Sequence, residues 1–311
     1  MAAAEQYRRQ AGLLVKVVPF VAAETCFALK GGTAINLFVR DMLRLSVDID
    51  LTYLPVRDRT NSLTGIDAAM RRIGGRISTG IRGAQVSLVE LQAERWVTRL
   101  MIRADGVQVK VEVTPVLRGC AYEPVMMAVS ERTEEAFGFA EIQVVSFADL
   151  YAGKIVAALD RQHPRDLFDV RELLVKEGIT SQLRIAFVVY LLSHNRPMAE
   201  EIAPTRLDIE AEYRRGFAGM TETPVTLEEL LRVREDLVDR VVGEMPGDHR
   251  RFLMSFERGE PEWDLLDLPH ARDLPAVRWR IEYLAQLGGE KRAKFIERLA
   301  TVLGGEIRRS G

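Results

Sequence analysis

The sequence predicts an α+β fold, in which a mixed N-terminal half is followed by an all-helical C-terminal half. Between residues 86 and 116, three segments carry β-branched residues with a period of two, which is typical of strands. From Phe147 onward, the apolar residues recur at helical spacing. A chain of 311 residues is too long for one small core. We therefore expect two domains, over residues 1–145 and 146–311.

The first part of the N-terminal half alternates helices with short strands. In chain order we expect a helix over residues 3–18, a strand over 25–30, a helix over 33–38, a strand over 47–53 and a helix over 58–73. Pro19 is expected to end the first helix, and Thr33 to cap the second. Gly74 and Gly75 are expected to end the third.

Strands fill the rest of this half, and helices fill the other. We expect strands over residues 86–91, 96–103, 107–116, 125–129 and 142–145. Asp105-Gly106 between the second and third of these is a hairpin signal. Helices are expected over 147–159 and 164–177. Further amphipathic helices follow, broken near Pro197, Pro204, Pro224, Pro246, Pro261 and Pro275. We expect Trp263 and Trp279 to pack inside the helical domain.

Composition and simple motifs exclude several classes of function. The net charge of −2, from 43 basic and 45 acidic side chains, does not indicate a nucleic-acid binder overall, although a local basic face is compatible with it. Cys26 and Cys120 form no CxxC pair, and no secretory signal is evident, so a reduced, cytoplasmic setting is expected. Residues 11–29 are too interrupted by charge and proline to cross a membrane. There is no Walker lysine loop, no Ser-His-Asp arrangement and no His/Cys cluster with zinc spacing.

The segment 47–53 places two carboxylates on one face of a strand. Residues two apart in a strand point the same way, so Asp48 and Asp50 share the face opposite Ile49. Carboxylates so close repel each other unless a cation lies between them, and hard oxygen ligands at this spacing suit Mg²⁺. The alternative is an exposed edge strand with a polar face. The first interpretation predicts a magnesium site that binds substrate phosphates.

Two neighbouring features also indicate a site for metal and phosphate. Gly31 and Gly32 lie between a strand and a helix, where backbone N–H groups can approach a phosphate, with Thr33 behind them. Otherwise they form only a turn and a helix cap. Glu112 lies on the polar face of the strand 107–116 and is a candidate third carboxylate beside the pair. Its alternative is a solvated strand face on which it pairs with Lys110.

Basic and hydroxyl groups next to the aspartates are candidate nucleotide ligands. Arg44 is suited to bidentate phosphate contact, and Lys30 is a weaker candidate. Ser46 lies on the same strand face as Asp48, so its hydroxyl is expected near the metal and phosphates, or else it makes a simple hydrogen bond at the strand entry. Phosphorylation of Ser46 would place negative charge beside Asp48 and shut the site off.

A second charged group lies in the helical half. Lys154 is the only lysine of its helix and stands among apolar residues, so it needs an anion. That anion is a nucleoside triphosphate in the functional interpretation, and Asp149 or Asp160 in the structural one. Asp166 and Asp169 lie three apart on the first turns of the next helix. One of them is expected to pair with Lys154, while the other meets a metal, the acceptor substrate or a nucleotide base.

These pieces together resemble a known family. The stretches "LKGGTAINL", "RLSVDIDL", "VKVEV" and "DLYAGKIVAALDRQHPRDLFDV", and the tail "LPAVRWRIEYL", are similar to those of the AbiEii/AbiGii toxins, which include the MenT group. The resemblance implies a polymerase-β-type nucleotidyltransferase core with a mixed sheet, followed by the helical domain. It also assigns the family's essential lysine to Lys154 and its essential aspartate to Asp169, with Asp166 second. In this family a serine or threonine at the place of Ser46 is implicated in control by some antitoxins.

The resemblance further implies a Mg²⁺-dependent toxin. It would move a nucleoside monophosphate from a triphosphate onto an acceptor hydroxyl, at the tRNA acceptor end, and a separate antitoxin would neutralise it. Asp48 and Asp50 would hold the metal, and Glu112 would complete the carboxylate set or act as base on the acceptor hydroxyl. Candidate RNA contacts are the basic clusters at residues 213–215, 248–252 and 290–295, each of which otherwise is a solvated helix face. The alternatives are a protein hydroxyl as acceptor, or a catalytically silent regulator that binds nucleotide or a partner.

Overall fold

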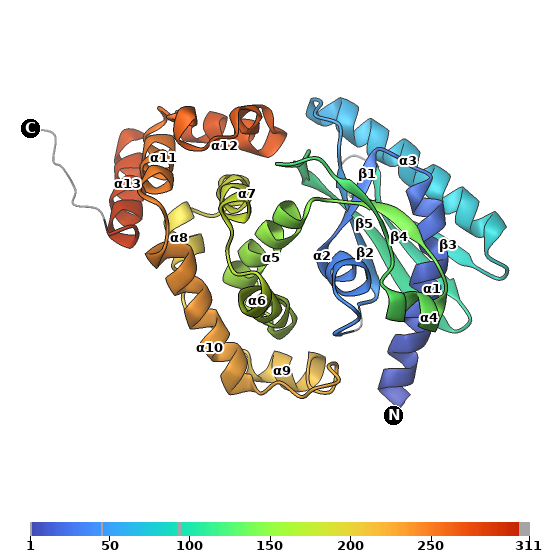
Figure 1. The fold of residues 1–311 in the computed structure, drawn as a ribbon. Helices are drawn as coiled ribbons and strands as arrows, with labels where there is room; N and C mark the ends of the chain where they lie inside the picture. The colour runs from blue at the N-terminus through green and yellow to red at the C-terminus, as the bar shows by residue number, and fades with distance from the viewer. Residues whose placement is uncertain (1, 45, 92–94, 305–311) are drawn as a thin grey trace, which may run out of the picture. The chain divides into compact units, whose positions relative to one another are not determined.

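The structure, a computed structural model, describes residues 2–44, 46–91 and 95–304 (Figure 1). The chain divides into two compact units. The first comprises Met1–Ser146 and the short return segment Gly219–Pro224; the second comprises Phe147–Ala218 and Val225–Gly311. The return segment is joined to the first unit by an antiparallel bridge between Arg44 and Thr221 and by an ion pair between Arg132 and Glu222.

A seven-stranded mixed sheet forms the centre of the first unit, among the residues described there. Its strands are β1 (Phe27–Lys30), β2 (Asp48–Tyr53), β3 (Gln85–Glu90), β4 (Val97–Ala104), β5 (Val107–Arg118), β6 (Val125–Ala128) and β7 (Glu141–Val144), in the order β3-β4-β5-β2-β1-β7-β6. The pairs β2/β5 and β1/β7 are parallel, and the other neighbours are antiparallel. The predicted α+β class is therefore confirmed.

The predicted hairpin at Asp105-Gly106 joins β4 to β5. Both residues have positive φ, 50° and 75°, which is the backbone that a two-residue turn of this kind requires. Ala104 and Val107 are paired directly beside the turn. The turn thereby sets the register of β5, and with it the position of Glu112.

Helices cover the sheet of the first unit. They are α1 (Ala2–Ala22), α2 (Gly31–Thr33), the π-helix η1 (Ala34–Val39), α3 (Arg59–Gly80) and α4 (Glu131–Phe137). α1 packs against β5 and β7, and α3 packs against β3 and β4. The face beneath them is apolar; Ile49, Val109 and Val111 on it are buried.

Three predicted helix boundaries in this unit are wrong. Pro19 lies inside α1, so its missing N–H costs one helical bond without ending a helix that is buried along its apolar stripe. Gly74 lies inside α3, where a Cβ would stand 3.2 Å from Leu88, so it permits close helix–sheet approach. Thr33 caps nothing, because helix begins at Gly31; its hydroxyl donates to the Asp48 carbonyl and to Ser46 instead.

The second unit is helical throughout its described residues. Its helices are α5 (Phe147–Arg161), α6 (Pro164–Lys176), α7 (Ser181–Leu192), α8 (Met198–Ile202), α9 (Glu210–Gly216), α10 (Leu227–Val238), η2 (Asp239–Gly243), α11 (Gly247–Arg258), η3 (Trp263–Leu265), η4 (Pro269–Asp273), α12 (Pro275–Gln286) and α13 (Gly289–Val302). Several predicted breaks are helix starts: Pro197 and Pro246 are N-caps, and Pro275 opens α12.

Trp263 and Trp279 of the helical unit differ in how they pack. Trp263 packs against Phe252 and Phe256, with ring centroids 5.3 and 6.2 Å away. Trp279 is 49% exposed and stacks on Tyr283, so the expectation that it lies inside was wrong. Both cysteines are free, and none of the helices described is both long and apolar enough to cross a membrane.

Candidate active site

A row of four charged residues crosses the middle of the sheet. Lys30 on β1 pairs with Asp50 on β2, Asp50 pairs with Glu112 on β5, and Glu112 pairs with Arg99 on β4. Directly paired residues point to the same face of a sheet, so the row reads positive, negative, negative, positive. Asp48 and Lys110 form the next pair on that face. The structure therefore brings Asp48, Asp50 and Glu112 together, as the sequence predicts.

The two aspartates of β2 retain unused oxygen lone pairs. The side chain of Asp48 is 46% exposed, and its closest cation is Lys110, with Nζ 3.9 Å from Oδ2. Asp50 is half-buried, and no side chain or backbone N–H among the described residues donates to its carboxylate. Burial raises the pKa of Asp50, and Asp48 and Glu112 add to the effect, although Lys110 and Lys30 oppose it. These carboxylates fit a hard divalent cation, which would bind the oxygen lone pairs that no hydrogen-bond donor occupies.

Glu112 is held as a carboxylate. Lys110 Nζ donates to its Oε2 at 2.9 Å, and Arg99 donates to its Oε1 through two nitrogens. Burial alone would raise the pKa of Glu112, but these bonds outweigh it and hold the pKa below its ordinary value. A depressed pKa makes Glu112 a weak proton acceptor. The geometry favours the third-carboxylate role over that of general base.

Lys30 completes the row. Its Nζ donates to Thr114 at 3.1 Å, and burial lowers its pKa although Asp50 opposes the effect. The charges of Lys30, Lys110 and Arg99 balance those of the three carboxylates. The sequence analysis had offered Lys110 as a partner of Glu112, and the structure has that pair. Arg99 is the residue that it missed, because Arg99 reaches Glu112 from the neighbouring strand β4.

The glycine pair permits close contact with the site side chains. Gly31 has φ of +75°, and a Cβ there would lie 2.8 Å from Asp50 Oδ2. A Cβ on Gly32 would lie 2.8 Å from Arg44 Nη2 and 3.1 Å from Ser46 Oγ. Arg44 is buried, and Thr33 donates to Ser46 at 3.0 Å. All the nucleotide-binding candidates of the N-terminal half thus cluster around the start of α2.

The charged group of the second unit is a buried ion-pair network. Lys154 on α5 is only 6% exposed, and its Nζ lies 2.8 Å from Asp166 Oδ1 and 3.0 Å from Asp169 Oδ2. Arg161 also binds Asp166 through both oxygens. Burial alone would raise the pKa of Asp166, but Lys154 and Arg161 hold it well below its usual range. The expectation that one aspartate pairs with Lys154 and the other does not is therefore wrong for this structure.

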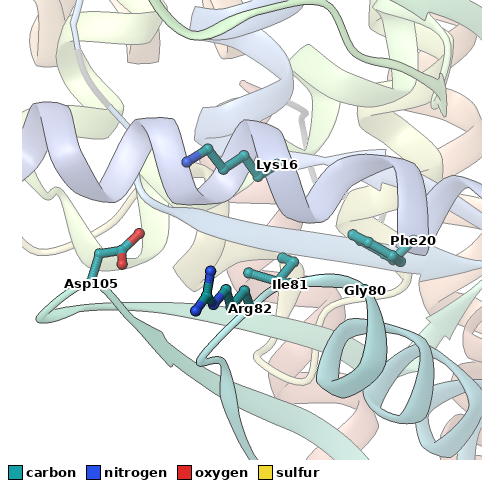
Figure 2. Close-up of a pocket in the computed structure, with 6 residues that line it drawn as sticks. All are labelled: Lys16, Phe20, Gly80, Ile81, Arg82 and Asp105. Carbon is teal, nitrogen blue, oxygen red and sulfur yellow. The ribbon is translucent and has the colours of Figure 1, made fainter.

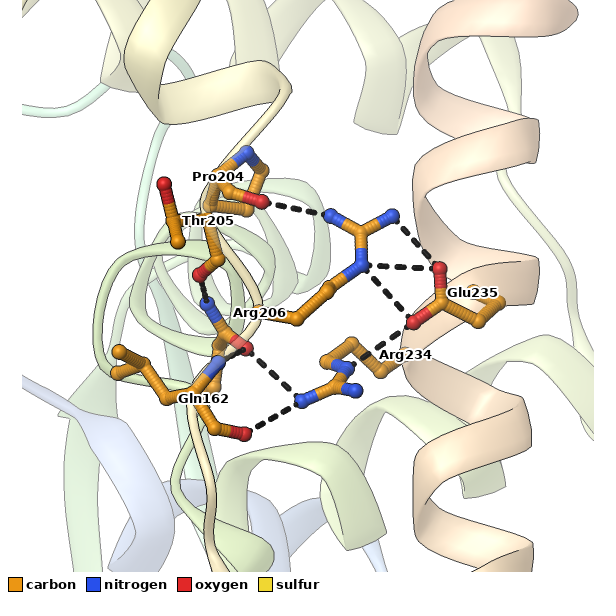
Figure 3. Close-up of polar contacts among 7 residues, drawn as sticks. Gln162, Pro204, Thr205, Arg206, Arg234 and Glu235 are labelled. Carbon is orange, nitrogen blue, oxygen red and sulfur yellow. Dashed lines mark hydrogen bonds and ion pairs between the residues drawn. The ribbon is translucent and has the colours of Figure 1, made fainter.

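A further network fixes the connection between α5 and α6 (Figure 3). Gln162 is fully buried with a positive φ of 49°, and its amide donates to the Thr205 carbonyl at 2.7 Å. Its oxygen accepts from the Leu207 N–H and from Arg234 Nη1, at 3.0 and 3.1 Å. Arg206 and Glu235 extend the network through paired hydrogen bonds. Sequence reasoning gave Gln162 no role, because its partners lie over 40 residues away.

One open pocket of the first unit has no part in this chemistry (Figure 2). It is lined by Lys16 and Phe20 from α1, by residues 80–82 at the end of α3 and by Asp105 in the hairpin turn. None of the candidate site residues lines it. The candidate site is thus identified by its charges and register.

Comparison with known proteins decides the family. The profile described as "Nucleotidyl transferase AbiEii toxin, Type IV TA system" matches residues 12–282, most of the chain. The chain belongs to the AbiEii family. The resemblance found in the sequence is therefore confirmed, and the chain is a nucleotidyltransferase. Membership in this type IV toxin–antitoxin family also implies a nucleoside triphosphate substrate and an antitoxin partner.

Comparison with solved structures supports the fold. The chain is similar to MenT4, a nucleotidyltransferase toxin from Mycobacterium tuberculosis H37Rv, with 16% identity and a TM-score of 0.58. The match covers 89% of this chain and 93% of that one. No curated protein matches. The region matched by the AbiEii profile includes every candidate site residue, from Gly31 to Asp169.

Proposed function

We propose that this AbiEii-family chain transfers a nucleoside monophosphate from a nucleoside triphosphate to an acceptor hydroxyl, with release of pyrophosphate, and that Mg²⁺ is required. The observation that carries the proposal is the pair Asp48 and Asp50 on β2. Both side chains point to one face, neither carboxylate receives a hydrogen bond from the described residues, and Glu112 stands in register beside Asp50. A carboxylate set of this kind is what a magnesium–phosphate substrate requires.

Within this proposal the main candidate site residues of the first unit have the following roles. Asp48 and Asp50 would hold Mg²⁺, which when bound neutralises phosphate charge and steadies the leaving pyrophosphate. Glu112, kept ionised by Lys110 and Arg99, would act as the third carboxylate. Gly32 leaves the backbone at the start of α2 accessible to a phosphate, and Arg44 beside it would add a guanidinium contact. Catalysis would rest on positioning and charge neutralisation.

The second unit would contribute Lys154, Asp166 and Asp169. Family resemblance gives Lys154 a phosphate-binding role and Asp169 a positioning role for the nucleotide or acceptor. Since Lys154 already contacts two buried carboxylates, a phosphate contact would replace one of them. The test is Lys154→Met, assayed at a temperature at which it is folded. A raised KM for the triphosphate supports the phosphate contact, and an unchanged KM removes it from the account.

We propose tRNA, at its acceptor end, as the acceptor. Among the basic residues of the three clusters, those already held in ion pairs or hydrogen bonds are poorer candidates for contacts to the tRNA phosphates. Arg214, Arg251 and Lys294 each pair with an acid of their own helix, and Arg250 donates to four backbone carbonyls near α11. Two residues of the three clusters remain exposed with no carboxylate within ion-pair reach among the described residues, Arg215 and Lys291. These two are the better candidates for phosphate contacts.

The acceptor is tested by labelling. Purified protein is incubated with Mg²⁺, each α-³²P-labelled triphosphate in turn, and either total RNA or total protein, with Asp48→Ala in parallel. Label on tRNA that disappears in the variant supports the proposal, and the labelled nucleotide identifies the donor. Label on protein alone would favour the second candidate, protein nucleotidylation. No label on either would favour a nucleotide-binding regulator.

A further inference from the structure

Three side chains from separate parts of the second unit meet outside the candidate active site. Asp160 lies in the last turn of α5, His194 follows α7, and Glu201 lies in α8. One oxygen of each carboxylate and one imidazole nitrogen lie within 4.8 Å of one another. His194 Nδ1 is 3.2 Å from Glu201 Oε2, and Nε2 is 3.8 Å from Asp160 Oδ2. The nucleotidyl-transfer proposal uses none of these residues.

Glu201 is the unusual member of the cluster. Its side chain is 0% exposed, and neither carboxylate oxygen has a hydrogen-bond partner among the described residues. His194 Nδ1 lies 3.2 Å from Glu201 Oε2 and already accepts the backbone N–H of Arg196, at 3.4 Å. Because Nδ1 has a single in-plane lone pair, it carries no hydrogen while it accepts that bond and cannot donate to the carboxylate. A buried carboxylate without a hydrogen-bond donor is unfavourable, so this arrangement calls for a cation or a proton.

The cationic side chains around the cluster do not neutralise Glu201, so one further cation is compatible with the local charge. Arg196 occupies Oδ1 of Asp160 at 2.7 Å, which orients that carboxylate and leaves Oδ2 directed at His194. The buried Arg280 is the other cation that acts on His194. Neither arginine donates to Glu201.

We propose that Asp160, His194 and Glu201 form a second divalent-metal site, and that its metal is Zn²⁺. One nitrogen and two carboxylate oxygens are a Zn²⁺ ligand set, whereas Mg²⁺ prefers oxygen ligands and keeps its waters. Tetrahedral Zn²⁺ places neighbouring ligand atoms about 3.4 Å apart, so the side chains need only close slightly. A water completes the fourth position, since Asp160 and His194 are partly exposed.

Such a metal would tie the end of α5 to the α7–α8 connection. Lys154 lies on α5 and Asp166 follows in α6, so the metal would stabilise the helices that present the ion-pair network. Its role is structural. The proposal is independent of nucleotidyl transfer, because no catalytic candidate is a ligand.

The test is Zn²⁺ titration of the metal-stripped full chain in millimolar Mg²⁺, by calorimetry with metal analysis. Wild type is expected to bind one Zn²⁺ per chain and to unfold several degrees higher when loaded. Glu201→Gln, which mimics a protonated carboxyl and so keeps the fold, should lose at least tenfold in affinity. His194→Gln should behave likewise and serves as the second variant.

Two controls separate this site from others. Glu200→Gln changes the neighbouring glutamate, which pairs with Arg298 at the surface, and should bind Zn²⁺ as wild type does. Asp48→Asn should also retain the bound Zn²⁺. The proposal is overturned if wild type binds no Zn²⁺ under these conditions. It is equally overturned if folded Glu201→Gln and His194→Gln bind Zn²⁺ as tightly as wild type, or if Asp48→Asn alone abolishes binding.

Discussion

At the scale of single residues, the candidate site combines electrostatic cost with close backbone approach. Asp50 lies half-buried between Lys30 and Glu112, its carboxylate receives no hydrogen bond from the described residues, and its pKa is raised. Gly31 lies so close to it that a Cβ would clash. A half-buried carboxylate and a tight backbone approach lower the stability of the fold. Proteins typically keep such unfavourable features where they are needed to bind a ligand.

Asp50→Asn should separate stability from function. The folded-state pKa of Asp50 lies above its ordinary value of 3.8, so the wild type loses stability as pH rises from that value through the folded pKa. Asparagine removes this loss. We expect the variant to unfold at a higher temperature than wild type at neutral pH without metal, yet to lose at least about 100-fold in transfer rate. Thermal melts at pH 4 and pH 7, with rate assays, check both.

The glycine pair gives a matched comparison. Gly32→Ala places a methyl 2.8 Å from Arg44 Nη2, so Arg44 must move, and we expect the KM for the triphosphate to rise at least fivefold. Gly75→Ala, inside α3 with nothing within 4 Å, should leave KM unchanged and stabilise the fold by about 0.5–1 kcal/mol. Equal KM values in the two variants would remove Arg44 from the phosphate site.

At the scale of elements, pairing decides what the charged residues do. The D-x-D pattern and the lone lysine of α5 were sufficient to predict the two charged groups, because period two and local apolarity are visible in a short segment. Arg99 and Gln162 were missed, because their importance arises from partners on another strand or in distant loops. Pro19 and Gly74 misled the prediction of boundaries, since tertiary burial outweighs local helix-breaking propensity.

Lys154→Met should show how much the ion-pair network between α5 and α6 contributes to the stability of the fold. Removing the lysine takes a buried cation away from the two buried carboxylates of Asp166 and Asp169, and breaking a buried ion pair typically costs about 3–5 kcal/mol. Lys176→Met, in the same pair of helices but with its ammonium exposed, should change stability by about 0.5 kcal/mol or less. Chemical denaturation measures both. A loss of unfolding free energy below about 1 kcal/mol for Lys154→Met would contradict a stabilising role of the network.

Gln162→Ala tests the connection between the same helices. It leaves the Leu207 N–H without this acceptor and removes one of the hydrogen bonds of Arg234, and we expect a loss of about 1–3 kcal/mol in unfolding free energy. Gln286→Ala, at the exposed end of α12, is the control and should be nearly neutral. If both variants unfold at the same denaturant concentration as wild type, the network does not stabilise the unit.

At the scale of the whole molecule, the chain consists of two units that carry different candidate site residues, all within the region matched by the AbiEii profile. The first holds the glycine pair and the carboxylates, and the second holds the Lys154 network. The change from strand to helix periodicity indicated a division near residue 146. The return of Gly219–Pro224 to the first unit could not be seen in sequence, because it depends on the Arg44–Thr221 bridge and the Arg132–Glu222 pair.

The most direct measurement of the central claim is the rate of nucleotidyl transfer against Mg²⁺ concentration. It is made for wild type, Asp48→Asn, Asp50→Asn and Asp105→Asn, the last a carboxylate of the hairpin turn outside the site. We expect wild type and Asp105→Asn to saturate with Mg²⁺ alike, and both β2 variants to be inactive at every concentration. Transfer by Asp48→Asn and Asp50→Asn with the Mg²⁺ dependence of wild type would contradict the account.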